Sequence, residues 1–221
     1  MQNEFYSEYY ASLMNTGIVA KMWSFIHRKM EKPFKGSTEN RVLEIGAGNG
    51  EHLKAIAHKV NFYHATDIRI DLLTKSLGGR QDVVIEMQDV TKLSYDDSYF
   101  DRVIVTCVLV HLDDPLLALT EIKRVVKPGG YISLYLPCEP GILLRVVRRF
   151  STHAKARQMG IEDITFLHFL EHKNYYIAID HFVGKVFANS KVRSRYYPLP
   201  FLSWNFNLFK LYTIKKAFEP E

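Results

Sequence analysis

Short apolar runs alternate with helix-like segments along the first two thirds of the chain. The runs are rich in β-branched and aliphatic residues, as buried strands are, and they lie at 42–45, 62–67, 83–87, 100–107 and 131–137. Between them, apolar residues recur at helical spacing in 51–57, 71–77 and 115–126. Strands that alternate with helices in this way predict an α/β protein with a doubly wound, mostly parallel sheet.

The strand expected at 42–45 ends in a turn where Gly46, Gly48 and Gly50 occupy every second position. Glycine tolerates positive φ and has no Cβ, so the backbone can turn tightly and approach a ligand closely. A strand, a glycine turn and a helix open the doubly wound folds, whose ligands bind at the carboxyl ends of the strands. The turn therefore predicts a ligand site, with a tight turn that binds nothing as the alternative.

Acidic residues follow the next two strands. Asp67 lies about 20 residues beyond the glycine turn, the spacing at which a carboxylate binds a ribose in such folds. Asp89 comes just after the strand expected at 83–87, and Ile68 could cover one face of an adenine ring. The alternative is a pair of carboxylates that only cap strand ends at the surface.

The segment before the first strand is predicted to be helical. Apolar residues recur there at helical spacing, namely Tyr9, Tyr10, Leu13, Met14, Val19, Met22, Trp23, Phe25 and Ile26. A turn-rich break at 32–37 separates them from the sheet. This helical segment either packs on the domain or forms a lid over its pocket.

Beyond residue 138 the pattern changes. Residues 141–150 read as an amphipathic helix that places Arg145, Arg148 and Arg149 on one face, and 141–157 contain no acidic residue. That face is a solvated surface, a clamp for an anionic acceptor, or a contact with anionic lipid headgroups.

Several histidines lie near one another in the later sequence. His168 and His172 are one helical turn apart, but this spacing alone is a weak metal signal. Packing or acceptor-binding histidines are the favoured interpretation, and no metal is expected. Tyr175 and His181 add polar groups nearby. A helix is expected at 177–187, followed by final strands at 193–198 and 208–214. The aromatic connection 199–206 is an acceptor wall, a lipid contact or ordinary packing.

Composition narrows the class of protein. The chain has 221 residues, 47% of them hydrophobic, enough for one α/β domain with a sizeable core. Its net charge of +5 is weaker than the dense basic patch of a nucleic-acid binder, so no nucleic-acid partner is expected. Cys107 and Cys138 fit a reducing cytosol, and the polar start of the chain is unlike a signal peptide. No apolar run is long enough to span a membrane, and a cytoplasmic protein is therefore expected.

Five motifs in sequence order together resemble the class I S-adenosylmethionine-dependent methyltransferases. They span residues 41–137 and are Glu44–Gly50, Asp67, Asp89–Val90, Phe100–Asp101 and Lys127–Gly130. The resemblance implies a Rossmann-like sheet of seven strands, mostly parallel, with the last strand inserted antiparallel between the fifth and sixth. The domain division that follows is a helical lid at 1–40, a cofactor-binding core at 41–137, a helical acceptor-binding insertion at 138–190 and a final hairpin at 191–221.

The same resemblance implies roles for individual residues around S-adenosylmethionine. The turn residues Gly46, Ala47 and Gly48 would hold the methionine part, with Glu44 near its amino group. Asp67 would accept from the ribose hydroxyls, beside Ile68. Asp89 and Val90 would meet the adenine, and Cys107 and Val108 would line the floor below the sulfonium. A carboxylate suits vicinal hydroxyls because it accepts charge-assisted hydrogen bonds.

The activity expected from this resemblance is methyl transfer to a hydroxyl or amine of a small or carrier-linked acceptor. For a hydroxyl, His111 is the first choice of general base, because it lies just beyond the fourth expected strand. His168, His172 and His181 are reserves. Arg148, Arg149, His168, His172 and Tyr175 are the residues predicted to bind the acceptor.

A faint likeness to methyltransferases of surface-polysaccharide and sugar biosynthesis favours a sugar or saccharide acceptor. A quinone or lipid acceptor is the competing enzyme hypothesis, and peripheral contact with a membrane surface would accompany it. Two hypotheses from different classes of protein are a non-catalytic cofactor-binding scaffold and a nicotinamide-dependent oxidoreductase. The sequence leaves the oligomeric state open.

Overall fold

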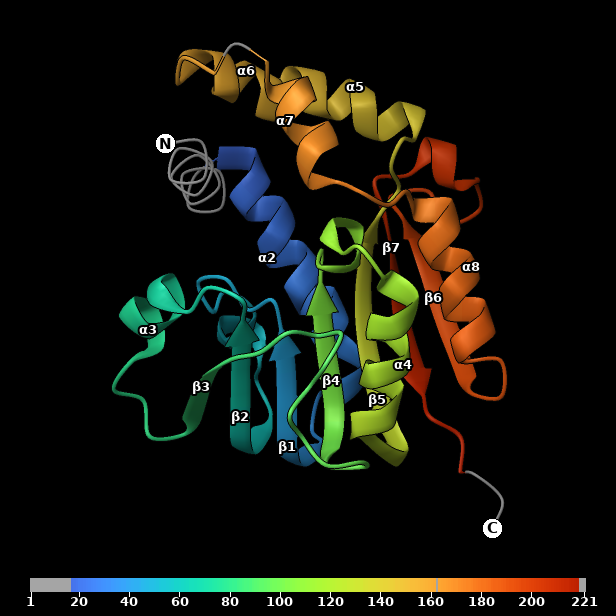
Figure 1. Ribbon diagram of the computed structural model, residues 1–221. Coiled ribbons are helices and arrows are strands. Elements are labelled where there is room, and N and C mark those ends of the chain that lie inside the picture. Colours follow the sequence, from blue (N-terminus) through green and yellow to red (C-terminus); the bar gives the residue numbers. More distant parts are fainter. Residues whose placement is uncertain (1–16, 162, 219–221) are drawn as a thin grey trace.

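A computed structural model describes residues 17–161 and 163–218, arranged as one sheet with helices on both faces (Figure 1). Tyr9, Tyr10, Leu13 and Met14, whose spacing predicted a helix, lie outside the described residues. The strands are β1 (Thr38–Ile45), β2 (Lys59–Asp67), β3 (Val83–Met87), β4 (Phe100–Thr106), β5 (Val126–Pro137), β6 (Lys191–Tyr197) and β7 (Phe209–Lys215). Their order in the sheet is β3-β2-β1-β4-β5-β7-β6.

The pairing confirms the predicted fold class. β1 pairs in parallel with β2 and β4, and the parallel ladder continues to β3 on one side and to β5 on the other. β7 lies between β5 and β6 and is antiparallel to both. The strand order reverses direction at β1 and β4, so the crevice outside their carboxyl ends is where such sheets bind ligands.

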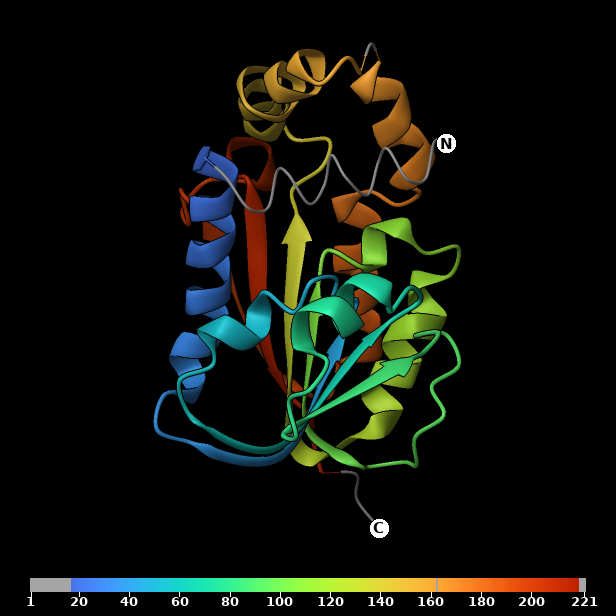
Figure 2. The same ribbon diagram turned by 90° about the vertical axis from the view of Figure 1, so that its left-hand side faces the viewer.

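Helices cover the two faces of the sheet unequally. The α-helices are α2 (Gly17–Glu31), α3 (Asp71–Leu77), α4 (Pro115–Val125), α5 (Ile142–Phe150), α6 (Thr152–Gln158), α7 (Ile164–Glu171) and α8 (Tyr176–Val186). Short 3₁₀ turns of the described residues lie next to strands, namely η1 (Lys32–Phe34), η2 (His52–Ala55), η3 (Leu109–His111) and η4 (Trp204–Phe206). Figure 2 shows α2 on one side of the sheet, α4 and α8 on the other, and α5, α6 and α7 beyond the carboxyl ends of the parallel strands.

The core explains why the apolar runs of the sequence became strands. Val103, Val105 and Ile132 face α4 and α8, whereas Val42 and Ile104 face α2, and all five are essentially buried. Strands with both faces covered need apolar residues at nearly every position. α4 begins as predicted, because the Asp114 side chain accepts a hydrogen bond from the backbone N–H of Leu117 and Pro115 starts the helix.

Two local predictions were wrong. The helix expected at 51–57 is only the short turn η2, because His52 points into the core and the chain becomes extended at Ile56. The strand expected at 131–137 begins earlier, because β5 already starts at Val126 and includes the motif Lys127–Gly130. An ion pair of 2.5 Å between Lys127 and Asp101 holds this irregular start against β4, where the register shifts.

Candidate active site

A cavity of about 580 Å³ lies at the carboxyl ends of β1, β2 and β4, a size typical of a small-molecule site. All ten residues predicted to bind the cofactor line it, and so does His111. They come from five separate segments that the parallel strands deliver to one edge of the sheet, namely 44–48, 67–68, 89–90, 107–108 and 111. The convergence predicted from the sequence is therefore present.

Two glycines shape the turn after β1. Gly46 and Gly48 have positive φ of 69° and 54°. A Cβ on Gly46 would stand 2.2 Å from Cγ2 of Val108, closer than two carbons can approach. The bare backbone therefore lets β1 and the segment after β4 close together on one side and leaves the other side open to a ligand.

Asp67 and Asp89 are both held by local hydrogen bonds. Asp67 Oδ2 accepts from the backbone N–H of Gly48 at 3.0 Å, and Oδ1 accepts from that of Arg69 at 3.1 Å. Asp89 Oδ1 accepts from the hydroxyl and the backbone N–H of Thr91, which lowers the pKa of Asp89. Two oriented carboxylates on one cavity can accept hydrogen bonds from hydroxyl and amino groups.

Glu44 lies deeper in the same wall. It is almost completely buried, and its Oε2 accepts from the hydroxyl of Tyr63 at 2.6 Å. Burial raises the pKa of Glu44, because it disfavours the charged carboxylate. A positively charged ligand group beside Glu44 would offset this cost of burying the charge.

Cys107 forms part of the floor and is inert as a nucleophile. Its φ of 59° is in the left-handed region, so β4 ends there in a sharp turn. Burial raises the pKa of the thiol to about 12, which keeps it protonated at neutral pH. The residue shapes the cavity instead of reacting.

His111 presents one nitrogen as a proton acceptor. Its Nδ1 lies 2.9 Å from the backbone oxygen of Glu171, and a carbonyl oxygen only accepts, so Nδ1 carries the proton and Nε2 the lone pair. Burial, and after it the neighbouring His172, lower the pKa of His111 to about 4. The imidazole is therefore neutral at physiological pH and able to accept a hydrogen bond inside the cavity.

Behind His111 lies a polar cluster that the sequence analysis did not identify. The Glu139 carboxylate accepts hydrogen bonds from the two terminal nitrogens of the Arg148 guanidinium, at 2.6 and 3.2 Å, and from Nδ1 of His172 at 2.5 Å. Burial alone would raise the pKa of Glu139, but these hydrogen bonds lower it to about 2. The His172 ring packs edge-on against His111, and its Nε2 is the one buried side-chain N or O atom without a hydrogen-bond partner among the residues that the structure describes.

The predicted acceptor-binding residues are thus divided. Arg148 and His172 belong to the cluster with Glu139. The His168 ring lies tilted beside that of His172, with 5.6 Å between the ring centroids, and burial lowers the pKa of His168 to about 3. Arg149 and Tyr175 are exposed, and none of the five predicted acceptor-binding residues lines the main cavity. The expected common basic face of α5 is therefore wrong for Arg148, which turns inward because the buried carboxylate needs a counter-charge.

A stripe of α2 forms one wall of the cavity. Trp23, Ser24, His27 and Arg28 line it, together with His52 of η2. The helical spacing predicted that α2 has a buried face. Of the two hypotheses for this segment, the lid is the one in which that face covers the pocket. Nothing in the spacing singles out His27, because its partners lie far away in the chain.

Across residues 17–161 and 163–218 there is no group of three histidine, cysteine, aspartate or glutamate side chains able to hold a metal ion. The same residues include no helix that is both long and apolar enough to cross a membrane. The histidines near Glu139 form hydrogen bonds and ring contacts with the residues around them.

Comparison with known proteins also indicates a methyltransferase. Residues 43–134 match the family model described as methyltransferase domain. The demethylmenaquinone methyltransferase of Clavibacter sepedonicus is 30% identical over 139 residues, which cover 62% of this chain and 55% of that protein. The ubiquinone/menaquinone biosynthesis C-methyltransferase of Bdellovibrio bacteriovorus is 29% identical over 113 residues, covering 48% and 47%. The chain thus spans about half the length of these two relatives.

A solved structure supports the fold. A protein of Methanococcus maripaludis, described as a candidate S-adenosyl-L-methionine-dependent methyltransferase, superposes with a TM-score of 0.66. The match covers 97% of this chain and 93% of that one at 17% identity.

Proposed function

We propose that the chain is a class I S-adenosylmethionine-dependent methyltransferase, as the match of residues 43–134 to the methyltransferase domain indicates, and that it transfers a methyl group to a small or carrier-linked acceptor. The observation that carries the proposal is the meeting of the bare turn at Gly46–Gly48 with Asp67 and Asp89 on one cavity. A dinucleotide enzyme would usually show a third glycine at position 51, where this chain has a glutamate.

The residues present fit S-adenosylmethionine group by group. The turn residues Gly46 and Gly48 line the cavity without side chains, Asp67 offers oxygens for two hydroxyls, and Asp89 can accept from an exocyclic amine. Glu44 supplies a buried carboxylate for an amino group. When bound, the cofactor would supply an electrophilic methyl group on a positively charged sulfur.

The chain's own contribution to catalysis is then mainly positioning. Holding a donor and an acceptor in line at contact distance can lower the barrier by about 7–11 kcal/mol. His111 can accept a proton at Nε2 from an acceptor hydroxyl, because its Nδ1 is occupied by the Glu171 carbonyl. The uncharged Cys107 and Val108 line the floor and keep water from that side of the cavity.

For the acceptor we favour a quinone-type or other lipid-linked ring. The support is indirect: the two curated relatives are named for menaquinone or ubiquinone substrates. The surface adds a second argument, since Ile142, Val146 and Phe150 form an exposed apolar stripe on α5, with Arg145 and Arg149 exposed beside it. An apolar stripe flanked by arginines suits the surface of a membrane with anionic lipids, from which a lipid acceptor would arrive.

A saccharide on a diphosphate carrier is the second candidate acceptor. A surface hollow of about 400 Å³ is lined by Arg149 and Arg157, together with Phe150 and Ala154. Two guanidinium groups at such a hollow would suit a diphosphate. Neither of the two curated relatives is named for a saccharide, so this acceptor ranks behind the quinone.

The test is to incubate the protein with isotopically labelled methyl donor and either membrane extract or soluble metabolite extract, followed by mass spectrometry. We expect labelled product from the lipid fraction, and none with the Asp67→Ala variant. A labelled product only in the sugar-containing fraction would support the saccharide instead. Tight cofactor binding with no labelled product in either fraction would support a non-catalytic scaffold.

A further inference from the structure

The outward face of α5 leaves a line of apolar side chains open to solvent. Ile142, Val146 and Phe150 follow one another at intervals of four residues, so they form one continuous stripe along the helix. Ile142 and Val146 are each 48% exposed, and Phe150 is 77% exposed. Single exposed apolar residues are normal on a protein surface, but a contiguous set on one helix face is typical of a surface that binds a partner.

The same face of α5 is cationic. Arg145 and Arg149 are exposed, and helical spacing places them beside the apolar stripe. Arg148 reaches the other way, to Glu139, and does not contribute to this face. Residues 141–161 contain no aspartate or glutamate. A partner that covers this face must therefore offer both apolar groups and negative charge.

A hollow of about 400 Å³ connects the two features. It is lined by Arg149 of α5, Arg157 of α6, Phe150 and Ala154. A guanidinium presents several N–H donors in one plane, which suits the oxygens of a phosphate. A lipid phosphate held by these two arginines would have its acyl chains next to the Phe150 ring.

The connection 199–206 extends the apolar surface beside α5. Its turn η4 packs against α5, and a Cβ on Gly141, just before the helix, would stand only 3.1 Å from the backbone oxygen of Trp204. Phe201 and Phe206 of this connection are 80% and 49% exposed. The connection has no acidic residue either, so its surface is apolar without being anionic.

A second copy of the chain is the less favourable partner for this face. In a symmetric dimer the same patch meets itself, so Arg145 and Arg149 of one copy would lie against the same arginines of the other. With no acidic residue on α5, nothing on the helix would compensate that repulsion. A bilayer that contains anionic lipids avoids it, because such a bilayer offers phosphates and acyl chains together.

We propose that α5 docks the protein on an anionic membrane, lying in the plane of the interface with its apolar stripe toward the acyl chains and Arg145 and Arg149 at the headgroup phosphates. The contact is peripheral, because a helix of nine residues is too short to span a bilayer. α5 lies beyond the carboxyl ends of the parallel strands, at the end of the sheet where the main cavity is (Figure 2). Docking through α5 therefore brings that end of the molecule to the bilayer.

This inference adds a partner to the proposed function without depending on it, because binding to vesicles needs neither cofactor nor acceptor. Co-sedimentation of the full chain would use vesicles of phosphatidylcholine alone and vesicles of phosphatidylcholine and phosphatidylglycerol in equal parts. Two double variants remove one feature each: Val146→Ser/Phe150→Ser the apolar stripe, and Arg145→Gln/Arg149→Gln the charge. All four side chains are exposed, so circular dichroism should show a folded protein in both cases.

The matched control removes the same charge elsewhere. Lys191→Gln/Arg193→Gln changes two exposed cations near the start of β6. β6 runs parallel to β5, so these residues lie toward the end of the sheet opposite the cavity. Any effect of net charge alone would be the same in this control as in the arginine variant of α5.

We expect the wild type to bind the anionic vesicles more tightly than the neutral ones, and to bind them less tightly as the salt concentration rises. Each α5 double variant should weaken binding to the anionic vesicles about 10-fold or more, whereas the β6 control should stay within about two-fold of the wild type. None of the substituted residues lines the main cavity, so every variant should bind S-adenosylhomocysteine as the wild type does.

Equal binding of the wild type to both kinds of vesicle, or no binding to either, would overturn the inference. An equal loss in the β6 control would do the same, since it would show an effect of net charge only. A loss in the arginine variant without a loss in Val146→Ser/Phe150→Ser would indicate a site for a soluble anion instead of a bilayer. A dimer that Val146→Ser/Phe150→Ser dissociates, measured by analytical ultracentrifugation, would identify the partner as a second copy. Failure of the wild type to bind S-adenosylhomocysteine would contradict the proposed function alone.

Discussion

The Asp67 carboxylate accepts a hydrogen bond from the backbone N–H of Gly48, with 3.0 Å between Oδ2 and the nitrogen. This contact ties the end of β2 to the glycine turn that follows β1, so the orientation of the acid and the shape of the turn depend on each other. It places a charged acceptor beside a stretch of bare backbone, as an adenosyl ligand would require.

The first prediction concerns Asp67 itself. Asp67→Ala should weaken binding of S-adenosylhomocysteine by about 1.5–3 kcal/mol, the usual cost of a lost hydrogen bond to a charged partner. Titration calorimetry measures it, with Asp96→Ala, an exposed carboxylate away from the cavity, as the matched control. An unchanged dissociation constant in Asp67→Ala would remove this residue from the site.

His111 should matter for the chemical step more than for cofactor binding. If the acceptor is a hydroxyl, His111→Gln should lower kcat about 10²-fold or more, because the lone pair at Nε2 is lost as a proton acceptor. Affinity for S-adenosylhomocysteine should stay close to that of the wild type. His181→Gln is the control, because the structure places this reserve histidine on the exposed surface and outside the cavity lining. Unchanged turnover in His111→Gln would mean that the acceptor needs no base.

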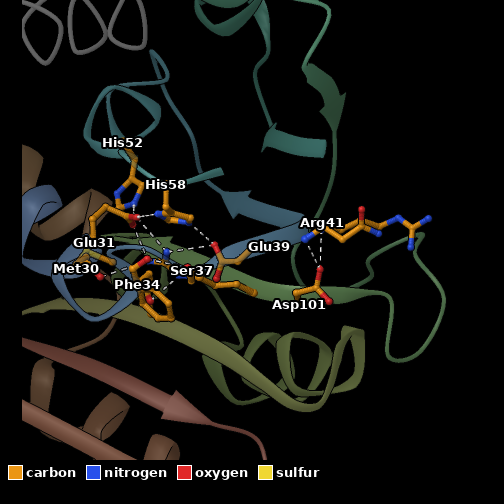
Figure 3. A network of polar contacts seen from close by, with 12 residues as sticks. Met30, Glu31, Phe34, Ser37, Glu39, Arg41, His52, His58 and Asp101 are labelled. Carbon is orange, nitrogen blue, oxygen red and sulfur yellow. Dashed lines mark hydrogen bonds and ion pairs between the residues drawn. The ribbon is translucent and has the colours of Figure 1, made fainter. Parts of the chain in front are cut away.

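The Arg102–Glu31 pair should be important for stability. The Arg102 side chain is fully buried and donates to both oxygens of Glu31, at 2.6 and 3.2 Å, and Glu31 also pairs with His52 (Figure 3). Arg102→Met leaves a buried carboxylate without its guanidinium, which costs about 3–5 kcal/mol in comparable cases. Urea unfolding followed by circular dichroism gives the free energy of unfolding. The control is Arg80→Ala, which breaks an exposed pair with Asp82 and should cost less than about 1 kcal/mol. Similar losses for the two variants would contradict the buried network.

Arg148 and Arg149 are neighbours in sequence with different expected effects. Arg148→Gln removes both guanidinium contacts to Glu139 and should destabilise the protein by about 1.5–3 kcal/mol. Arg149→Gln should leave stability within about 0.5 kcal/mol, as exposed substitutions usually do, and affect only binding of an anionic acceptor or surface. Urea unfolding gives the free energy of unfolding of both variants. A larger loss in Arg149→Gln than in Arg148→Gln would contradict the inward position of Arg148.

Stability should fall as the pH falls below neutrality. The pKa values of His27 and His111 are lowered in the folded protein, to about 3 and 4, from an unfolded value of 6.5. Between pH 6.5 and 4 the unfolded chain therefore binds more protons than the folded one, and each histidine costs on the order of 1 kcal/mol at pH 5.5. Glu31 and Glu139, with pKa values lowered to about 2, stabilise the fold above pH 4.5 and lose that contribution as the pH falls towards 2.

Urea unfolding at pH 7.5 and 5.5 checks this dependence, and His111→Asn should show a smaller difference between the two pH values than the wild type. Equal stability of the wild type at both pH values would show that the histidines titrate normally.

The fold and the cavity were predictable because their signals are local. Apolar runs such as 100–107 mark buried strands, and residues that follow parallel strands meet at one edge of the sheet. For that reason Asp67, Asp89 and Cys107 were predicted, and lie, on the same cavity.

The buried networks were not predictable, because their partners are distant in the chain. Arg102 and Glu31 are 71 positions apart, and His27 and His52 are 25 apart. Helical spacing predicted which residues share a face of α5 but not the direction in which Arg148 reaches, since that depends on Glu139 of a preceding turn. The helix expected after the glycine turn failed for a related reason: the hydrogen bonds of His52 to Glu31 and His27 hold η2 against α2.

The central claim is that the glycine turn and the two separated acids form one adenosyl site. Titration calorimetry of the wild-type protein with S-adenosylhomocysteine, compared with NAD under the same conditions, tests it most directly. We predict saturable binding of one S-adenosylhomocysteine per chain and no saturable binding of NAD. Binding of NAD in preference, or no binding of S-adenosylhomocysteine by a folded protein, would contradict the claim.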